Sequence, residues 1–102
     1  KSRFNKIPVL NKEGISIIKQ EEISVIKKID ELTKIILNNG KEIYSKRSYV
    51  KFIDIVPKSI FFPINSEMHI NLLQVNTPPE RFRNRVIMKN GEKITHLVDQ
   101  NT

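Results

Sequence analysis

The sequence contains no cysteine, only three glycines and no long apolar run. Without cysteine the chain forms neither a disulfide framework nor a thiolate metal site, a composition that fits the reducing cytoplasm. No segment approaches the roughly 20 apolar residues that a membrane-spanning helix needs. The charged N-terminal segment is broken by Pro8 and is not typical of a signal peptide. We therefore expect a cytoplasmic protein that makes no membrane contact.

Motifs of known catalytic and nucleotide-binding sites are also missing. The chain has no Gly-x-Ser-x-Gly nucleophile elbow, no P-loop and no dinucleotide-binding Gly-x-Gly-x-x-Gly. His69 and His96 lack neighbouring residues at metal-ligand spacing, and the acidic pairs at 21–22 and 30–31 fall in predicted turns. The sequence thus predicts no catalytic residue, no metal site and no cofactor, and we do not expect an enzyme.

Positive charge is what the sequence has in excess. Eighteen Lys and Arg residues outweigh eleven Asp and Glu residues, which gives a net charge of +7. Residues 1–51 hold twelve basic and six acidic residues, whereas residues 52–102 hold six and five. A positive field of this size attracts polyanions and favours contact with nucleic-acid phosphates. Many basic proteins bind no nucleic acid, so charge alone leaves both interpretations open.

The 102 residues, 38% of them hydrophobic, suit a single globular domain over the whole chain. Apolar residues mostly alternate with polar ones, which predicts short strands. The predicted strands cover 4–10, 15–19, 23–29, 33–38, 41–46, 60–64, 84–89 and 92–98, with 68–72 ambiguous and 73–76 extended. Asn39-Gly40 and Asn90-Gly91 predict hairpins with type I′ turns, because such turns need positive φ at both central residues.

Residues 48–56 depart from this alternation. Their apolar side chains have the spacing of one helical face: Tyr49, Phe52, Ile53 and Val56. Ser48 is a candidate N-cap, and Pro57 ends the segment because a residue before proline avoids the helical region. Pro63 marks 60–64 as an edge strand. The expected fold is mainly β, an elongated sandwich or barrel-like domain of about eight to ten short strands with one short helix.

Basic residues gather in three groups. These groups are Lys1, Arg3, Lys6 and Lys12 along the first strand, then Lys46, Arg47 and Lys51, and finally Arg81, Arg83 and Arg85. The arginines of the last group alternate with other residues, so an extended chain would place all three on one side. A planar guanidinium can donate two hydrogen bonds to one phosphate. Each group is nevertheless compatible with an ordinary solvated face.

The segment at 61–71, with sequence FFPINSEMHIN, lies between the predicted helix and the last hairpin. Phe61-Phe62, Ile64 and Asn71 match, without a gap, the segment F-x-R-[IV]-H-[RK]-S-[FY]-[IL]-V-N of the LytTR family of bacterial DNA-binding domains. The order of strands, hairpins and helix resembles that family over nearly the whole chain. The resemblance implies an elongated β fold that binds DNA through loops and usually forms the output half of a response regulator.

Several polar positions of that family segment are replaced. Pro63 stands where the family has Arg, Asn65 where it has His, Ser66 at a basic position and Glu67 at a Ser. After the last hairpin, 97–99 is Leu-Val-Asp, where the family usually carries Ser and Arg. Asn65 offers a donor and an acceptor to a base edge, and Ser66 can reach a base or a phosphate. Glu67 would be repelled by phosphate but can accept from a cytosine amino group.

The resemblance implies sequence-specific binding of double-stranded DNA at promoter repeats, with loops in the major groove. The candidate DNA-binding residues are Lys12, Lys46, Arg47, Asn65, Ser66, Arg81, Arg83, Arg85 and Lys93. The basic side chains would hold the phosphate backbone, and Asn65 and Ser66 would contact bases. The chain begins at Lys1 without an initiator Met, so we expect it to be the C-terminal part of a two-component transcriptional regulator. A homodimer on DNA and an upstream receiver or sensor domain are compatible with this assignment.

Two other functions remain open from the sequence. The replacements at Pro63, Glu67 and Asp99 suit a protein-interaction module that has the LytTR-like fold but does not recognise DNA sequence. An RNA-binding β-barrel is less favoured, because no cluster of aromatic residues offers a stacking platform for bases. The adjacent Phe61 and Phe62 are interpreted as core residues.

Overall fold

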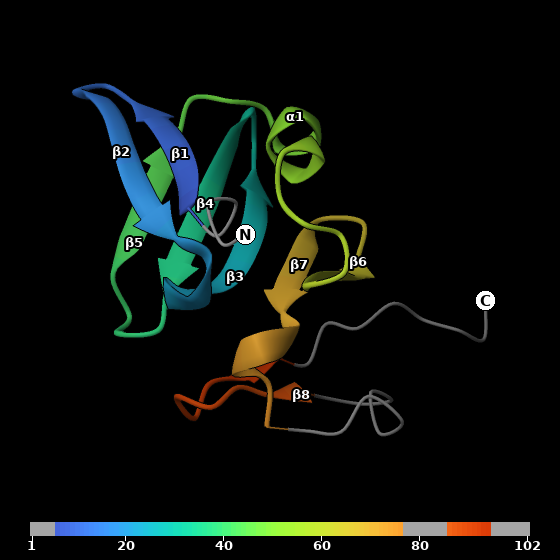
Figure 1. Cartoon of the computed structure of the whole chain (residues 1–102). Helices are drawn as coiled ribbons and strands as arrows, with labels where there is room; N and C mark the ends of the chain where they lie inside the picture. Colours follow the sequence, from blue (N-terminus) through green and yellow to red (C-terminus); the bar gives the residue numbers. More distant parts are fainter. Residues whose placement is uncertain (1–5, 77–85, 95–102) are drawn as a thin grey trace.

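The computed structural model describes residues 6–76 and 86–94 and is built mainly of β-strands (Figure 1). The elements are β1 (Lys6–Asn11), β2 (Gly14–Lys19), η2 (Gln20–Glu22), β3 (Ile23–Ile29), β4 (Leu32–Leu37), β5 (Glu42–Ser45), α1 (Tyr49–Asp54), β6 (Phe61–Asn65), β7 (Met68–Asn71), η3 (Leu72–Gln74), β8 (Val86–Ile87) and β9 (Lys93–Ile94). The prediction of a mainly β fold with one short helix is confirmed. No helix in the described ranges is long and apolar enough to cross a membrane.

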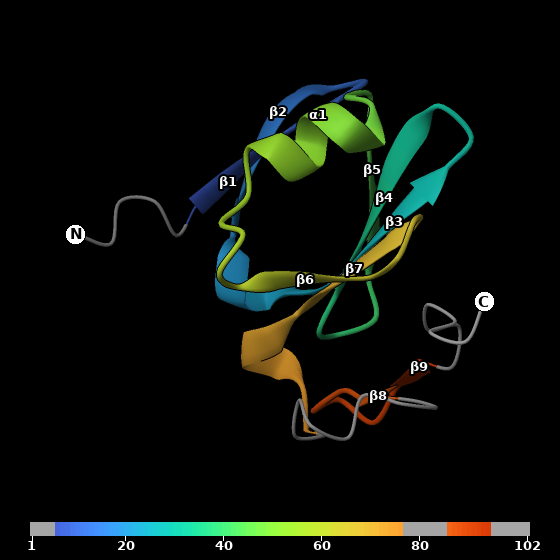
Figure 2. The ribbon, with the colours of Figure 1, turned by 90° about the vertical axis from the view of Figure 1, so that its right-hand side faces the viewer.

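Five strands form a central antiparallel sheet in the order β5-β4-β3-β7-β6. The hairpins β1–β2 and β8–β9 form two smaller sheets. Figure 2 shows the β1–β2 hairpin and α1 on one side of strands β3, β7 and β6, and the β8–β9 hairpin on the other. The central sheet is therefore covered on both faces, in the manner of a sandwich.

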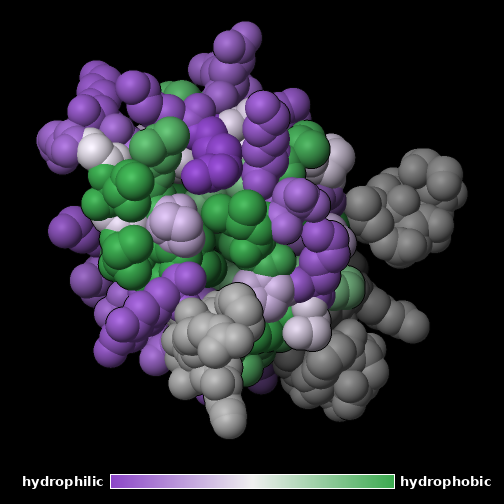
Figure 3. Space-filling model, turned by 45° about the horizontal axis from the view of Figure 1, so that its top comes forward, coloured by the Kyte–Doolittle hydropathy of each residue, from purple (hydrophilic) through white to green (hydrophobic). Residues whose placement is uncertain are grey.

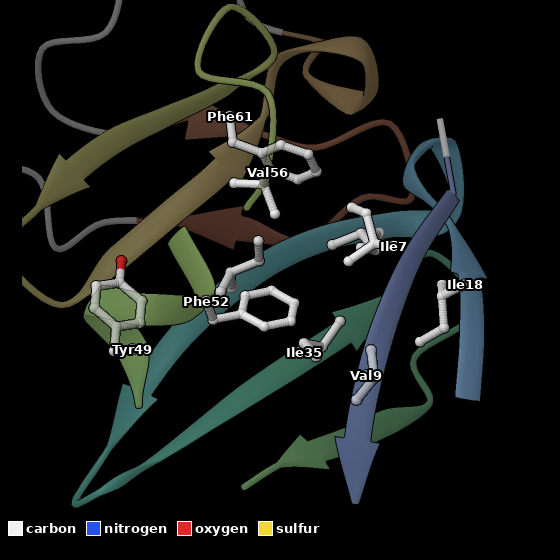
Figure 4. Close-up of a cluster of buried hydrophobic side chains, with 10 residues drawn as sticks. Ile7, Val9, Ile18, Ile35, Tyr49, Phe52, Val56 and Phe61 are labelled. Carbon is white, nitrogen blue, oxygen red and sulfur yellow. The ribbon is translucent and has the colours of Figure 1, made fainter. Parts of the chain in front are cut away.

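The larger hydrophobic core fills the space between the β1–β2 hairpin, α1 and one face of the central sheet (Figure 4). Its buried residues are Ile7, Val9, Ile18, Ile23, Ile26, Ile35, Tyr49, Phe52, Val56 and Phe61. In β1 the residues alternate, with Ile7 and Val9 buried and Pro8 and Leu10 exposed. This is the period of two that a strand with one buried face requires.

The smaller core lies under the β8–β9 hairpin. Its buried residues are Val25, Ile64, Met68, Ile70, Val86, Met88 and Ile94. Strand β3 contributes to both cores, because Ile26 points to the larger one and Val25 to the smaller one. Because β3 is covered on both faces, its first four residues, Ile23 to Ile26, are all buried, including the polar Ser24.

Helix α1 begins after Ser48, as the sequence predicts, but it ends at Asp54, two residues before the end of the predicted segment at Val56. The Ser48 side chain caps it by accepting from the backbone nitrogen of Lys51 at 3.4 Å. Tyr49, Phe52 and Val56 are buried on the predicted face. Ser48 thus satisfies one of the backbone N–H groups that a helix leaves unpaired at its start.

Both Asn-Gly hairpins are confirmed, but the predicted type I′ turns are wrong. Gly40 and Gly91 have φ of 89° and 94°, whereas Asp30 is the only described non-glycine residue with positive φ. The side-chain oxygens of Asn39 and Asn90 instead accept from the backbone two residues later, at 2.9 and 3.0 Å. These side-chain bonds order the turns with only the glycine at positive φ.

The extended conformation predicted for 73–76 is wrong over its first part, where η3 forms a 3-10 turn. The Asn71 side chain caps this turn by accepting from the Leu73 backbone nitrogen at 2.8 Å.

Phe61 is buried as predicted, but Phe62 is 40% exposed because β6 alternates between its two faces. Pro63 lies on β6, an edge strand, as predicted. The predicted strand residues at 4–5, 84–85 and 95–98 lie outside the described residues.

Candidate nucleic-acid interface

Two of the predicted basic loops meet at one end of the molecule. The turn between β1 and β2 carries Lys12, and the connection from β5 to α1 carries Lys46 and Arg47. The backbone nitrogen of Lys46 donates to the carbonyl oxygen of Leu10 at 2.7 Å. This bond joins the end of β1 to the end of β5 and brings the two loops together at the upper end of Figure 1.

Lys12 and Lys46 line the same open groove, which has a volume of about 620 Å³. Lys41 joins them there, although the sequence analysis did not single it out. The Asn39-Gly40 hairpin could have identified Lys41, because it places this lysine directly before the first residue of β5. The rest of the groove is lined by Asn11, Glu13, Ser16, Leu32, Glu42, Ile43, Tyr44 and Ser45. The groove thus combines three cations with an apolar floor and two carboxylates.

One of those carboxylates is already paired. Glu42 forms a salt bridge of 3.2 Å with Lys34, whose ammonium lies 6.0 Å from the centre of the Tyr44 ring. The hydrogen bond to Glu42 raises the pKa of Lys34. By contrast, none of the three groove lysines forms a salt bridge with another described residue. Their charges are therefore available to an anion.

Two buried hydroxyls fix the loop that carries Arg47. Thr33 Oγ1 donates to the Arg47 carbonyl oxygen at 2.9 Å, and the Arg47 backbone nitrogen donates to Ser45 Oγ at 3.1 Å. Within the described part of the chain, the buried Nε of Arg47 has no hydrogen-bond partner. A buried guanidinium nitrogen is costly without an acceptor, which an anionic ligand could supply. The sequence analysis missed Thr33 and Ser45, because their role depends on a pairing across strands.

The turn between β6 and β7 carries the predicted base-contacting residues Asn65 and Ser66. Asn65 Oδ1 accepts from the Glu67 backbone nitrogen at 2.8 Å, which orders the turn, and Ser66 is exposed. The Glu67 carbonyl oxygen accepts from the Lys28 backbone nitrogen at 2.9 Å. Glu67 therefore lies beside Asp30, and both line one small surface depression. The depression thus combines two carboxylates, one from each of two neighbouring turns, with the ammonium of Lys28.

Asn71 has a structural role in the same segment. Its Nδ2 donates to the carbonyl oxygens of Gln20 and Ile23, both at 2.8 Å. The side chain is completely buried and ties the connection between β2 and β3 to β7. Together with the buried Phe61 and Ile64, it shows that the matching positions of the segment hold the fold.

A hydrogen bond between Tyr49 Oη and His69 Nδ1 joins α1 to β7. Burial raises the pKa of Tyr49 above its usual range. Burial, followed by the charge of Lys58, lowers the pKa of His69. At neutral pH the bond therefore joins an uncharged hydroxyl to an uncharged imidazole, and the imidazole tautomer sets which of the two donates. In the described ranges, no group of three His, Cys, Asp or Glu residues comes together as a metal site.

The remaining predicted residues do not join this end of the molecule. Lys93 is exposed on β9, and Figures 1 and 2 both place the β8–β9 hairpin at the opposite end from the β1–β2 turn. Arg81, Arg83 and Arg85 lie outside the described residues. The structure thus brings Lys12, Lys46 and Arg47 together and separates Lys93 from them.

Comparison with known proteins gives a likeness in structure rather than in sequence. The sequence matches no protein-family model and no curated protein. Among the solved structures that match is the LytTr DNA-binding domain of a Bacillus cereus protein assigned as a methyl-accepting/DNA response regulator. The match has a TM-score of 0.68 and 15% sequence identity, and it covers 88% of this chain and 84% of that one. The chain therefore has the fold of a LytTr DNA-binding domain.

Proposed function

We propose that this chain binds double-stranded DNA as the output domain of a bacterial transcriptional regulator. The observation that carries the proposal is the meeting of Lys12, Lys46 and Arg47 at one end of a LytTr-like fold. Cations that pair with no carboxylate in the described part of the chain, and that are held on ordered loops, are suited to phosphate oxygens. Release of the counterions condensed on DNA would then supply most of the binding free energy.

The turn between β6 and β7 has a different part in this proposal. Glu67 of this turn and Asp30 of the neighbouring β3–β4 turn repel phosphates, and Lys28 beside them offsets only one of the two charges. We therefore place the contacts of the turn with DNA on base edges. Ser66 can donate to or accept from a base, and Glu67 can accept from a cytosine amino group. Phosphate contacts at the groove would set the register, and this turn would supply the sequence preference.

The proposal also covers the end of the molecule that carries the β8–β9 hairpin, and the cellular context of the chain. Lys93, with Arg81, Arg83 and Arg85 before β8 in the sequence, would contact the duplex at a second place. Binding as a homodimer at promoter repeats, an upstream receiver or sensor domain and a cytoplasmic location all belong to the same proposal. They follow from the resemblance to response-regulator output domains.

A salt series with duplex DNA tests the proposal. Replacing Lys12 and Lys46 together with Ala should weaken binding and reduce the slope of log K against log[salt] by about 2, since each phosphate contact contributes about 0.9. The matched control is Lys58→Ala, because Lys58 is an exposed lysine away from the groove, paired with Asp54. It should leave the slope unchanged. Undetectable duplex binding at low salt would refute the proposal and leave the protein-interaction hypothesis standing.

A further inference from the structure

Strand β2 forms an open edge of the β1–β2 hairpin. Its register with β1 runs from Asn11 opposite Gly14 to Lys6 opposite Lys19, with only two residues in the turn. In such a hairpin the pair beside the turn is hydrogen-bonded and the pairs then alternate. The Leu10 and Ile15 pair is therefore not bonded across the hairpin, and Leu10 indeed directs its carbonyl oxygen to Lys46.

The same alternation turns the backbone groups of Ile15 and Ile17 outward, away from β1. No described residue bonds to these outward groups, whereas the Lys19 nitrogen, at the end of the strand, donates to Glu22 Oε1 at 3.3 Å. Pro8 lies opposite Ile17, where its missing N–H costs the hairpin nothing. The free edge therefore runs along Ile15–Ile17 and carries unpaired donors and acceptors.

The outward face of this hairpin is apolar, which is unusual for the solvent side of a two-stranded sheet. Ile15 and Ile17 are 67% and 61% exposed, and Leu10 and Pro8 lie beside them on the same face. Figure 3 shows hydrophobic side chains gathered on the side where the hairpin lies, surrounded by hydrophilic ones. Proteins usually protect an edge strand with charge or proline, as Pro63 protects β6. Strand β2 has neither along this stretch.

On the outward face itself the charged side chains are lysines, whereas Glu13 lies beside Lys12 in the turn and Glu22 accepts from the Lys19 backbone nitrogen at the other end. Lys6 and Lys19 lie opposite each other at one end of the hairpin's outward face, and Lys12 lies at the turn. A second copy of this chain would bring another net charge of +7 to a surface already flanked by lysines. An acidic partner would instead be attracted.

We propose that β2 binds an acidic, extended peptide segment of a partner protein by strand addition. The segment would pair with the outward backbone groups of Ile15 and Ile17, lay apolar side chains beside them and place carboxylates near Lys6 and Lys19. This surface is the lateral edge of the hairpin, so the proposal does not rest on DNA binding. The two activities can therefore fail separately.

The test uses the full 102-residue chain and a fluorescein-labelled nine-residue peptide. The side chains on one face of this peptide are two valines, to lie beside Ile15 and Ile17, followed by a glutamate, to lie beside Lys19, and threonine fills the positions between them. Fluorescence anisotropy at low salt should show saturable binding. Amide hydrogen exchange at Ile15 and Ile17 should slow by about tenfold or more at saturation, because a paired amide is protected. A peptide with lysine in place of glutamate should bind much more weakly.

Two variants separate the backbone contribution from the side chain. Ile17→Pro removes the outward donor without breaking a bond to β1, and Ile17→Thr keeps that donor as the matched control. Peptide affinity should fall about tenfold or more for Ile17→Pro and much less for Ile17→Thr. Should Ile17→Pro fail to fold, Ile17→Glu keeps the donor and should weaken binding of the acidic peptide by repulsion.

Four results would overturn the proposal. The first is no binding of the acidic peptide at low salt, and the second is equal binding of the lysine peptide. The third is dimerisation of the chain, measured by sedimentation equilibrium and abolished by Ile17→Glu, which would make a second copy the occupant. The fourth is slowed exchange at Ile15 and Ile17 on adding duplex DNA, which would assign the edge to nucleic acid.

Discussion

The two faces of the central sheet are covered by different amounts of structure. On one face the β1–β2 hairpin and α1 enclose a core that contains Tyr49, Phe52 and Phe61. On the other face the β8–β9 hairpin, with two residues in each strand, covers a core of aliphatic and methionine side chains. An isolated two-stranded hairpin is at best marginally stable, so β8–β9 depends on docking to the sheet. The comparison indicates that the part of the molecule around the larger core is stable and that the β8–β9 hairpin is held more weakly.

The largest effect should come from Phe52→Ala in the larger core. Phe52 is completely buried between α1 and the sheet, so its removal leaves a cavity under two elements. We expect a loss of about 3–5 kcal/mol of unfolding free energy, measured by urea denaturation. Val50→Ala on the same helix is the control, because Val50 is 78% exposed and should change stability by less than about 0.5 kcal/mol. A loss under 1 kcal/mol for Phe52→Ala would show that this core is not the dominant one.

Asn71→Ala should have the next largest effect. The substitution removes the hydrogen bonds to Gln20, Ile23 and Leu73 from a buried site. At roughly 1 kcal/mol for each bond, the expected loss is about 2–3 kcal/mol. Asn71→Asp keeps the acceptor for Leu73 and loses both donated bonds. Its unfolding free energy therefore separates the contribution of the bonds to Gln20 and Ile23 from that of the bond to Leu73. Stability equal to that of the unmodified chain in Asn71→Ala would contradict the anchoring role.

Val86→Ala should sharpen the contrast between the two cores. Val86 is completely buried in the smaller core, and its truncation should cost about 2 kcal/mol from lost burial and the cavity. Because β8–β9 makes so few strand pairs, we expect much of this loss as local opening. Amide exchange should then quicken in β8 and β9 more than in β3 and β4. Equal acceleration in all four strands would mean that the two cores unfold as one unit.

The smallest effect concerns the hydrogen bond between Tyr49 and His69. Tyr49→Phe should cost about 1 kcal/mol at neutral pH, because it leaves the Nδ1 atom of His69 without its hydrogen-bond partner. The pKa of His69 is lowered in the folded state, so the unfolded state takes up the proton first as the pH falls below about 6.5. Stability from this site is therefore complete above that pH and decreases below it.

Urea midpoints at pH 7.5 and 5.5 measure this dependence. The decrease on acidification should be smaller in His69→Gln, which cannot take up the proton. An identical decrease in both proteins would assign the acid sensitivity to other groups.

Local patterns in the sequence were sufficient for most of the fold. Ser48 located the start of the helix, alternation located the strands and Pro63 marked an edge. Each of these signals acts within a few residues of the chain. The turn type was wrong because Asn39 and Asn90 form side-chain hydrogen bonds that compete with positive φ. The 3-10 turn at η3 was missed for a similar reason, since the Asn71 side chain caps it.

The candidate interface was less predictable, because it depends on contacts between distant strands. Lys12 and Lys46 were identified by charge, but their meeting depends on the bond between Lys46 and Leu10. The positions of Thr33 and Ser45 beneath Arg47 depend on the pairing of β4 with β5. Lys93 belonged to none of the three basic groups and was a candidate through the resemblance, and the fold places it at the other end from Lys12 and Lys46.

The buried amide of Asn71 also has a consequence for the order of folding. Its two bonds to carbonyl oxygens join residues that are 51 and 48 positions apart in the chain. Contacts of such sequence separation carry a high loop-closure cost and are made after local hairpins such as β4–β5. The amide thus closes a structure that other contacts have already assembled. Its natural contribution is to slow unfolding, and hence to lengthen the lifetime of the native state, rather than to hasten its formation.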